Sequence, residues 1–422
     1  AAPVGTSVVA PASGVILYAA APVGSNSGYL GNWTGYPAGG GNTIQMLCNV
    51  NGTLYAVSFF HLSQSIYVSA GQSVSQGQTI ALSGNSGNSS GAHTHIEVYN
   101  LGSMSVSDAV ARFSAGADFA WGTGWSSWAP VSWELFSKAV PKLNQLDDVG
   151  EVEEGTFSVE KVLSLKPDLL VLADWQYEML GSDLDAINEA GIPIVVLDYN
   201  AQTLDKHIKS TEIIGELTGQ KDRAAKIAKE YKDIVEHIQT TVKNAKLAKQ
   251  PKVYVEFGRG GPAEQGMTFF SSMWGSMISL VGAENVAPAE IGKWGTLAAE
   301  KVLAAKPDAI IITGRETELK KNQDGMVMGF GIEKAEAERR LNAFKHRAGW
   351  AELPAVKNNR VYAAYHANSR TLSDSASVQF VAKAAYPDLF KDLDPQQTYL
   401  NFYKNYLPVT PEGTIYLFPE TK

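Results

Sequence analysis

The 422-residue sequence predicts a multidomain protein: an N-terminal all-β domain followed by a two-lobed α/β region with a long linking helix. Two observations lead to this fold class. Residues 1–128 contain only four charged side chains, whereas the rest of the chain is rich in lysine and glutamate. In addition, one helix–turn–strand pattern occurs twice in the charged region, 140 residues apart.

The first region has the pattern of a β domain. Runs of β-branched and aromatic residues, such as 14–18 and 54–60, alternate with turns rich in Gly, Asn and Ser. A segment rich in Trp, Gly and Ser, residues 121–130, then precedes the change in composition. We therefore expect an all-β domain over residues 1–128 and a second domain over 129–422.

The second region contains an internal repeat. Residues 160–172 and 300–312 each predict a short helix, a Lys-Pro-Asp turn and a buried strand. Between the two copies, residues 221–250 contain neither Pro nor Gly and predict one long helix that ends before Pro251. Two lobes joined by a rigid helix would enclose a cleft. The expected parts are a first lobe at 133–220, a linking helix at 221–250 and a second lobe at 251–422.

Composition excludes several classes of protein. A net charge of −8 argues against nucleic acid as a partner. No apolar run approaches the roughly 18 residues that a membrane-spanning helix needs. The single cysteine, Cys48, excludes an internal disulfide and a cysteine-based zinc cluster.

Two histidines stand out in the β domain. His93 and His95 are two residues apart on a predicted strand, so their side chains should share one face. Two imidazoles on one face can hold a metal together, or one can hold it while the other acts as a base. The spacing alone leaves both alternatives open.

Several motifs around these histidines resemble one enzyme family. Residues 71–81, 83–87 and 93–97, together with the Phe-His-Leu-Ser sequence at 60–63, resemble the lysostaphin-like zinc endopeptidases, which are peptidoglycan hydrolases. This resemblance implies zinc as cofactor and peptidoglycan as substrate. It also implies that His95 is a zinc ligand and that His61 and His93 are catalytic residues beside the metal.

The sequence departs from that family at its start. The other two zinc ligands of the family come from an H-x-x-x-D motif ahead of the segment that corresponds to residues 2–6, where this sequence begins. A catalytic zinc normally has three protein ligands and a water. We therefore expect an incomplete zinc site. The alternative is an active endopeptidase whose missing ligands come from elsewhere.

The second region resembles a transport family. Residues 156–163 and 166–168, the long helix and the repeat resemble substrate-binding proteins of ABC importers for iron-siderophores, haem and cobalamin. The resemblance covers residues 133–422 and lacks the strand–helix unit with which the family begins. It implies a small-molecule metal chelate, a ferric chelate or haem, as ligand and an importer permease as partner. Because the sequence contains the N-terminal segment of neither family, we expect a fusion, natural or engineered, or a shortened chain.

Candidate ligand-binding residues follow the predicted strands, because loops at strand C-termini line the cleft in such folds. Phenol and imidazole groups are good ligands for ferric iron and haem, and arginines pair with anionic groups. Each of these residues has an alternative role in packing or as a surface charge. His207, His237 and His346 are interpreted as structural or solvent-exposed. The candidates are Trp175, Tyr177, Arg259, Arg315, Tyr365, His366 and Arg370.

Two functions compete. The favoured one is an exported bacterial substrate-binding protein for an iron chelate or haem-like ligand, joined to an endopeptidase-type domain with an incomplete zinc site. The alternative is an active zinc-dependent cell-wall endopeptidase. Both imply an extracellular, cell-wall or periplasmic location.

Overall fold

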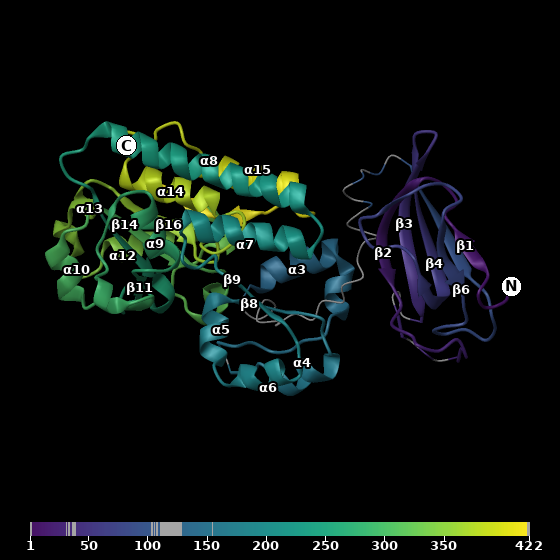
Figure 1. Cartoon of the computed structure of the whole chain (residues 1–422). Coiled ribbons are helices and arrows are strands. Elements are labelled where there is room, and N and C mark those ends of the chain that lie inside the picture. Colours follow the sequence, from purple (N-terminus) through teal and green to yellow (C-terminus); the bar gives the residue numbers. More distant parts are fainter. Residues whose placement is uncertain are drawn as a thin grey trace. The chain divides into compact units, whose positions relative to one another are not determined.

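The structure, a computed structural model, describes residues 2–30, 32, 34–35, 39–102, 104, 106, 109, 129–153 and 155–419. The chain divides into two units, Ala1–Phe119 and Ala120–Lys422 (Figure 1). Of the segment rich in Trp, Gly and Ser at residues 121–130, residues 121–128 lie outside the described residues. Among the residues that the structure describes, no helix has the length and apolar character needed to cross a membrane.

The first unit is built on one antiparallel sheet with the strand order β1-β6-β4-β3-β2-β5, to which β7 is added beside β4. The long strand β4 pairs with β7 over its first part and with β6 at its end. The core of the first unit contains Ile16, Ile44, Met46 and Phe59. The strands are β1 (Ser7–Val9), β2 (Gly14–Ala20), β3 (Asn42–Val50), β4 (Thr53–Ile66), β5 (Ser73–Val74), β6 (Thr79–Ser83) and β7 (His95–Gly102).

The all-β prediction for this unit is confirmed in part, by the sheet. Val106 and Ala109, which follow β7, have helical backbone. Ala109 is fully buried and packs in a small cluster with Leu17, Leu47 and Leu54. Ala109 therefore covers a small part of the apolar surface of the sheet, whereas Val106 is exposed.

The first lobe of the second unit has a small core around Val162, Leu172 and Ile187. Its strands β8 and β9 are parallel. Ser158 caps α4 by accepting a hydrogen bond from the amide of Lys161. The elements from residue 130 to residue 217 are α3 (Pro130–Ala139), η1 (Pro141–Gln145), α4 (Val159–Leu165), β8 (Leu170–Ala173), α5 (Asp174–Leu180), α6 (Asp183–Glu189), β9 (Ile194–Leu197) and α7 (Leu204–Leu217). Of these, α3 and α7 pack against the core of the second lobe through Leu135, Phe136 and Leu204.

The linking helix α8 runs over Lys221–Ala245, so it is shorter than the predicted 221–250. It ends because Lys246 adopts a left-handed conformation with φ 46°, well before Pro251. The helix also packs against the second lobe. Tyr231, Val235 and Ile238, spaced at helical intervals, are buried in the core of the second lobe. Figure 1 shows α8 beside α7 and α14.

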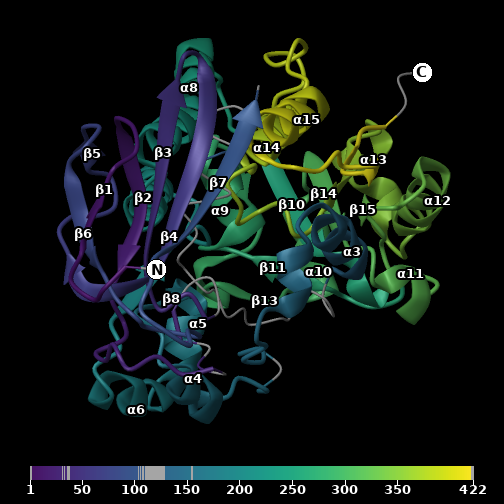
Figure 2. The same cartoon turned by 90° about the vertical axis from the view of Figure 1, so that its right-hand side faces the viewer.

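The second lobe contains a mixed sheet with the order β13-β11-β10-β14-β16-β18, and β12 pairs with β10. The central strands β10, β14 and β16 are parallel. The strands β11 and β13, labelled in Figure 2, extend one edge in antiparallel fashion. The strands are β10 (Lys252–Phe257), β11 (Met267–Phe269), β12 (Glu284–Asn285), β13 (Trp294–Thr296), β14 (Ala309–Gly314), β16 (Val361–Tyr365) and β18 (Tyr416–Leu417).

The helices and short elements of this lobe surround that sheet. As predicted, α4–β8 and α10–β14 repeat one pattern, and Lys166 and Lys306 end the two helices in the left-handed conformation. The elements are η2 (Gly258–Gly260), α9 (Met273–Leu280), η3 (Ala289–Ile291), α10 (Ala299–Ala305), α11 (Glu318–Lys321), β15 (Gly329–Phe330), α12 (Lys334–Lys345), η4 (Trp350–Glu352), α13 (Pro354–Lys357), α14 (Ser375–Ala385), α15 (Pro395–Tyr406) and β17 (Gly413–Thr414).

Candidate metal centre and ligand-binding residues

Three histidines converge in the first unit. His61 comes from the distal part of β4, His95 begins β7, and His93 forms a single bridge with Gly84 just before β7. Each ring offers one nitrogen, and the three nitrogen atoms lie within 4.8 Å of one another. The structure thus brings together all three histidines that the sequence indicated.

One ring nitrogen of each histidine lies close to an oxygen atom of the protein. His61 Nδ1 lies 2.8 Å from the carbonyl of Ser86, and His93 Nδ1 lies 2.8 Å from the carbonyl of Gly91. His95 Nε2 lies 3.3 Å from a carboxylate oxygen of Glu97. Metal-binding histidines typically use their second nitrogen in this way, which fixes the ring and its tautomer.

His61 is held in an unusual backbone conformation. Its φ is 60°, although it lies within a strand, and its amide donates to the carbonyl of Gly40 at 2.8 Å. A non-glycine residue in this region of φ costs on the order of 1–3 kcal/mol and is often found at functional sites. Here the conformation directs a buried imidazole toward His93 and His95.

The donor set fits zinc. Burial lowers the pKa of His61, and the neighbouring imidazoles of His93 and His95 lower it further, so this ring is neutral near pH 7. Neutral imidazole is the form that binds metal. Three imidazole donors correspond to the ligand number of a catalytic zinc. His95, predicted as the metal ligand, is equivalent in this respect to His61 and His93, which were predicted as catalytic.

In the second unit, the aromatic candidates of the first lobe lie on a helix, which corrects the expectation that they lie on a loop. Trp175 and Tyr177 belong to α5, which begins directly after β8. Trp175 is half-buried and packs against the first-lobe core. Tyr177 is 44% exposed. These two neighbouring aromatics therefore have different surroundings.

The second-lobe candidates Arg315 and His366 share a neighbour. His366 follows β16 and stacks on Phe257, with the ring centroids 3.9 Å apart. The guanidinium of Arg315, after β14, lies 5.4 Å from the same Phe257 ring. The sequence order β10, β14, β16 is also the spatial order of these parallel strands, so their C-terminal ends meet.

Burial and neighbouring charges determine the protonation state of His366. Burial lowers the pKa of His366 well below its ordinary value, and the positive charges of Arg370 and Arg315 add to this effect. His366 is therefore a neutral imidazole, and its Nδ1 lies 2.9 Å from the hydroxyl of Thr313. Arg370 is half-buried and reaches the sulfur of Met273 at 3.7 Å.

Tyr365 and Arg259 differ from their predicted positions. Tyr365 is the last residue of β16 rather than a loop residue, and it is buried. Its hydroxyl donates to Oε1 of Glu316 at 3.3 Å, and burial together with Glu316 raises its pKa. The hydroxyl of Tyr365 is thus already hydrogen-bonded to Glu316. Arg259 lies in the short helix η2, and its side chain is exposed.

The two lobes contact each other through residues that the sequence did not single out. Lys293 of the second lobe pairs with Asp174 at 3.0 Å and with Glu178 at 2.5 Å, both on α5. Glu153 and Glu151 of the first lobe act electrostatically on Arg370. Charge interactions therefore reach across the lobes at α5 and at Arg370.

A buried junction also involves a histidine that was predicted to be structural or solvent-exposed. His207 on α7 is fully buried, and its Nε2 lies 2.8 Å from Oδ1 of Asp374. Its ring stacks on Tyr231 with the centroids 3.6 Å apart. Gln202, at φ 52°, donates to the other oxygen of Asp374. His237 and His346 are exposed.

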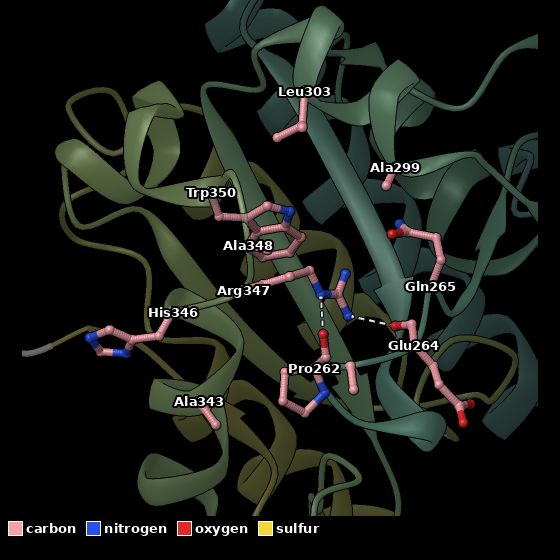
Figure 3. Close-up of a pocket in the computed structure, with 11 residues that line it drawn as sticks. Pro262, Glu264, Gln265, Ala299, Leu303, Ala343, His346, Arg347, Ala348 and Trp350 are labelled. Atoms are coloured by element: carbon pink, nitrogen blue, oxygen red, sulfur yellow. Dashed lines mark hydrogen bonds between the residues drawn. The ribbon is translucent and has the colours of Figure 1, made fainter.

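A hollow of about 510 Å³ opens elsewhere on the second lobe (Figure 3). It contains none of the predicted ligand-binding residues. Arg347 is one of its lining residues, and its guanidinium donates to the carbonyls of Pro262 and Glu264 and to the carboxylate of Glu256. The guanidinium of Arg347 is therefore already engaged with protein groups, which indicates a structural role for this side chain.

Fold and residues together define a two-lobed binding protein that carries a second, histidine-bearing β unit. The chain belongs to the periplasmic binding protein family, whose model matches residues 142–366. Residues 1–107 match the model of peptidase family M23.

Individual proteins support this assignment. The crystal structure of the TroA-like periplasmic binding protein FepB from Veillonella parvula is 34% identical, with a TM-score of 0.62, over 68% of this chain and 83% of that chain. The uncharacterized ABC transporter substrate-binding lipoprotein YvrC of Bacillus subtilis is 26% identical over 61% of this chain and 73% of its own length. The vitamin B12-binding protein of Pectobacterium atrosepticum is 26% identical over 49% and 70%. The protein is a substrate-binding protein of the ABC-importer type joined to an M23 peptidase domain.

Proposed function

We propose that the second unit binds an anionic metal chelate or haem-like ligand between its lobes and delivers it to the permease of an ABC importer at the cell envelope. The observation that carries this proposal is the grouping of Arg315, His366 and Arg370 after β14 and β16. Two guanidinium charges suit carboxylate groups, and a neutral imidazole suits a metal centre. A relative named as a vitamin B12-binding protein agrees with a metal-centred ligand.

Exposed apolar side chains on both lobes support a ligand with a large apolar surface. Tyr177 on α5 is 44% exposed, and Met267 and Trp294 on β11 and β13 are 40% and 37% exposed. Lys293, next to Trp294, holds α5 through two ion pairs. Binding sites for cofactor-sized ligands combine such apolar surface with a few polar groups that fix orientation.

The test is a titration of the full chain with haemin, ferric citrate and cyanocobalamin, followed by tryptophan fluorescence and calorimetry. Loss of a charge-assisted contact costs about 1.5–3 kcal/mol, so Arg370→Ala should weaken binding of an anionic probe about 10- to 100-fold. The matched control is Arg339→Ala, because Arg339 is an exposed residue of α12. Equal affinities in the two variants, or no binding of any probe by the parent protein, would contradict the proposal.

We propose further that the first unit is a zinc-dependent endopeptidase acting on peptidoglycan, with His61, His93 and His95 as the residues that hold the metal. The observation that favours this second function is the convergence of three imidazole nitrogens. When bound, zinc supplies a Lewis acid that activates water near neutral pH. The chain's own contribution is to fix the three rings through Ser86, Gly91 and Glu97.

Zinc content and wall hydrolysis test this second function together. The purified protein should carry zinc and release soluble fragments from peptidoglycan, and His95→Ala should lose both properties. His346→Ala, which changes an exposed histidine of the other unit, is the control. Retention of stoichiometric zinc in His95→Ala would show that the metal is held elsewhere.

A further inference from the structure

Glu316 is a buried carboxyl group that neither the predicted sites nor the comparisons assign. It follows Arg315 directly after β14 and is only 4% exposed. Its Oε1 accepts a hydrogen bond from the hydroxyl of Tyr365 at 3.3 Å. Its Oε2 is buried without a hydrogen-bond partner. A buried carboxylate with an unsatisfied oxygen is unstable, and such groups usually take up a proton instead.

The surroundings offer little compensation for a negative charge. Two phenols from elements packed around Glu316 interact with it, Tyr365 on β16 and Tyr403 on α15, and burial raises the pKa of both, so both are neutral. On β15, a Cβ added at Gly329 would lie 3.0 Å from Oε2, so the main chain there is close to the carboxyl group. Arg315 is the positive charge that acts on Glu316, and its Nε also donates to Glu318 of α11 at 3.3 Å.

The balance of these effects favours the neutral acid. Burial raises the pKa of Glu316 to about 7, against the lowering effects of its own amide, the Tyr365 hydroxyl and the Arg315 charge. The group therefore changes its charge close to neutral pH. Ionised, it would oppose the charge of Arg315, which itself acts electrostatically on Arg370 and His366.

We propose that Glu316 binds a proton in the folded protein and that its charge sets how strongly Arg315 and Arg370 attract an anionic ligand. The second part rests on the proposed binding function. Neutral Glu316 adds no opposing charge beside Arg315, which pairs with Glu318, whereas ionised Glu316 lowers the positive potential that Arg315 presents to the ligand. In turn, an anionic ligand that offsets Arg315 makes protonation of Glu316 easier, so binding and proton uptake are linked.

The proton is tested without any ligand. Difference infrared spectra of the full chain between about pH 5.5 and about pH 8.5 should contain the carbonyl band of one buried protonated carboxylic acid. Glu316→Gln should lack this band and still fold, because a neutral amide resembles the protonated acid in shape. Glu300→Gln, at an exposed glutamate of α10, should keep the band. A band that persists in Glu316→Gln would overturn the proposal, because the proton would belong to another group.

The charge effect is tested with haemin, whose propionate groups are anionic. Its affinity for the parent protein, divided by its affinity for Glu316→Gln, should fall roughly two- to tenfold as the pH rises from about 6 to about 8.5. The ratio cancels the pH dependence of haemin itself. A ratio that does not change with pH would refute the charge effect while leaving the binding function intact. If haemin, ferric citrate and cyanocobalamin all fail to bind at either pH, the binding function is wrong, and the charge effect is refuted with it.

Discussion

The ion pair between Arg347 and Glu256 should be one of the strongest determinants of stability in the second unit. Glu256 lies on β10 with a fully buried side chain, and Arg347 reaches it with two hydrogen bonds of 2.7 Å each. The same guanidinium donates to the carbonyl of Pro262 at 2.9 Å and lies 4.6 Å from the ring centroid of Trp350 (Figure 3). One side chain thus connects the central sheet, the loop after β10 and the segment after α12.

The cost of Arg347→Met follows from these contacts. Methionine keeps the apolar stem but leaves the carboxylate of Glu256 buried with neutral donors only, from Tyr254, Gln265 and the amide of Gly266. Removing one partner of a buried pair costs about 3–5 kcal/mol. The carbonyl of Pro262 also loses its donor, which adds about 1 kcal/mol. We therefore expect a loss of about 5 kcal/mol, or roughly 10 °C in Tm.

Urea denaturation followed by far-UV circular dichroism measures this loss. The control is Arg339→Met, because Arg339, on the helix α12 that precedes Arg347, pairs with Glu336 at the surface, where such pairs contribute about 0–1 kcal/mol. The double variant Glu256→Gln with Arg347→Met removes the uncompensated charge and should recover part of the stability. A loss below about 1 kcal/mol in Arg347→Met, or no recovery in the double variant, would refute the reasoning.

Three further predictions concern other parts of the chain. The pKa of Glu316 is about 7 in the folded protein, against an ordinary value of 4.5, so its stabilising contribution is complete below pH 4.5 and falls by about 3 kcal/mol as the pH rises to 7. Urea titrations should show this pH dependence in the parent protein but not in Glu316→Gln. Parallel pH profiles of the two proteins would refute this prediction. His207→Ala should lower the free energy of unfolding by about 3 kcal/mol, because it opens a cavity against Tyr231 and removes a partner of Asp374. The exposed control His237→Ala should lower it by less than about 0.5 kcal/mol. Similar values for the two variants would contradict a stabilising role of the buried junction. Zinc bound to the first unit should be lost on dialysis as the pH falls through the histidine range to about 5, because imidazole must be neutral to bind metal, and zinc retained there would exclude a site made of imidazoles.

The sequence by itself predicted two regions of different composition and much of the local structure. The change in charge near residue 129 predicted two regions of different fold class, because a sheet-rich unit and a helix-rich unit need different residues. The repeated pattern at 160–172 and 300–312 predicted α4–β8 and α10–β14, since helix periodicity, the turn and the apolar strand are all encoded over a few neighbouring positions. The spacing of His93 and His95 likewise indicated two of the three histidines of the candidate metal centre.

Tertiary structure alone decided the environments of the charged residues. Lys293 and Asp174 are 119 positions apart, and His207 and Asp374 are 167 apart, so no local pattern could indicate that they pair. Glu316 looks like an ordinary acid beside an arginine in the sequence; only its burial against Tyr365 and Gly329 makes it a proton-binding group. Local patterns follow from neighbours along the chain, whereas desolvation and charge pairing depend on which strands and helices the fold places together in space.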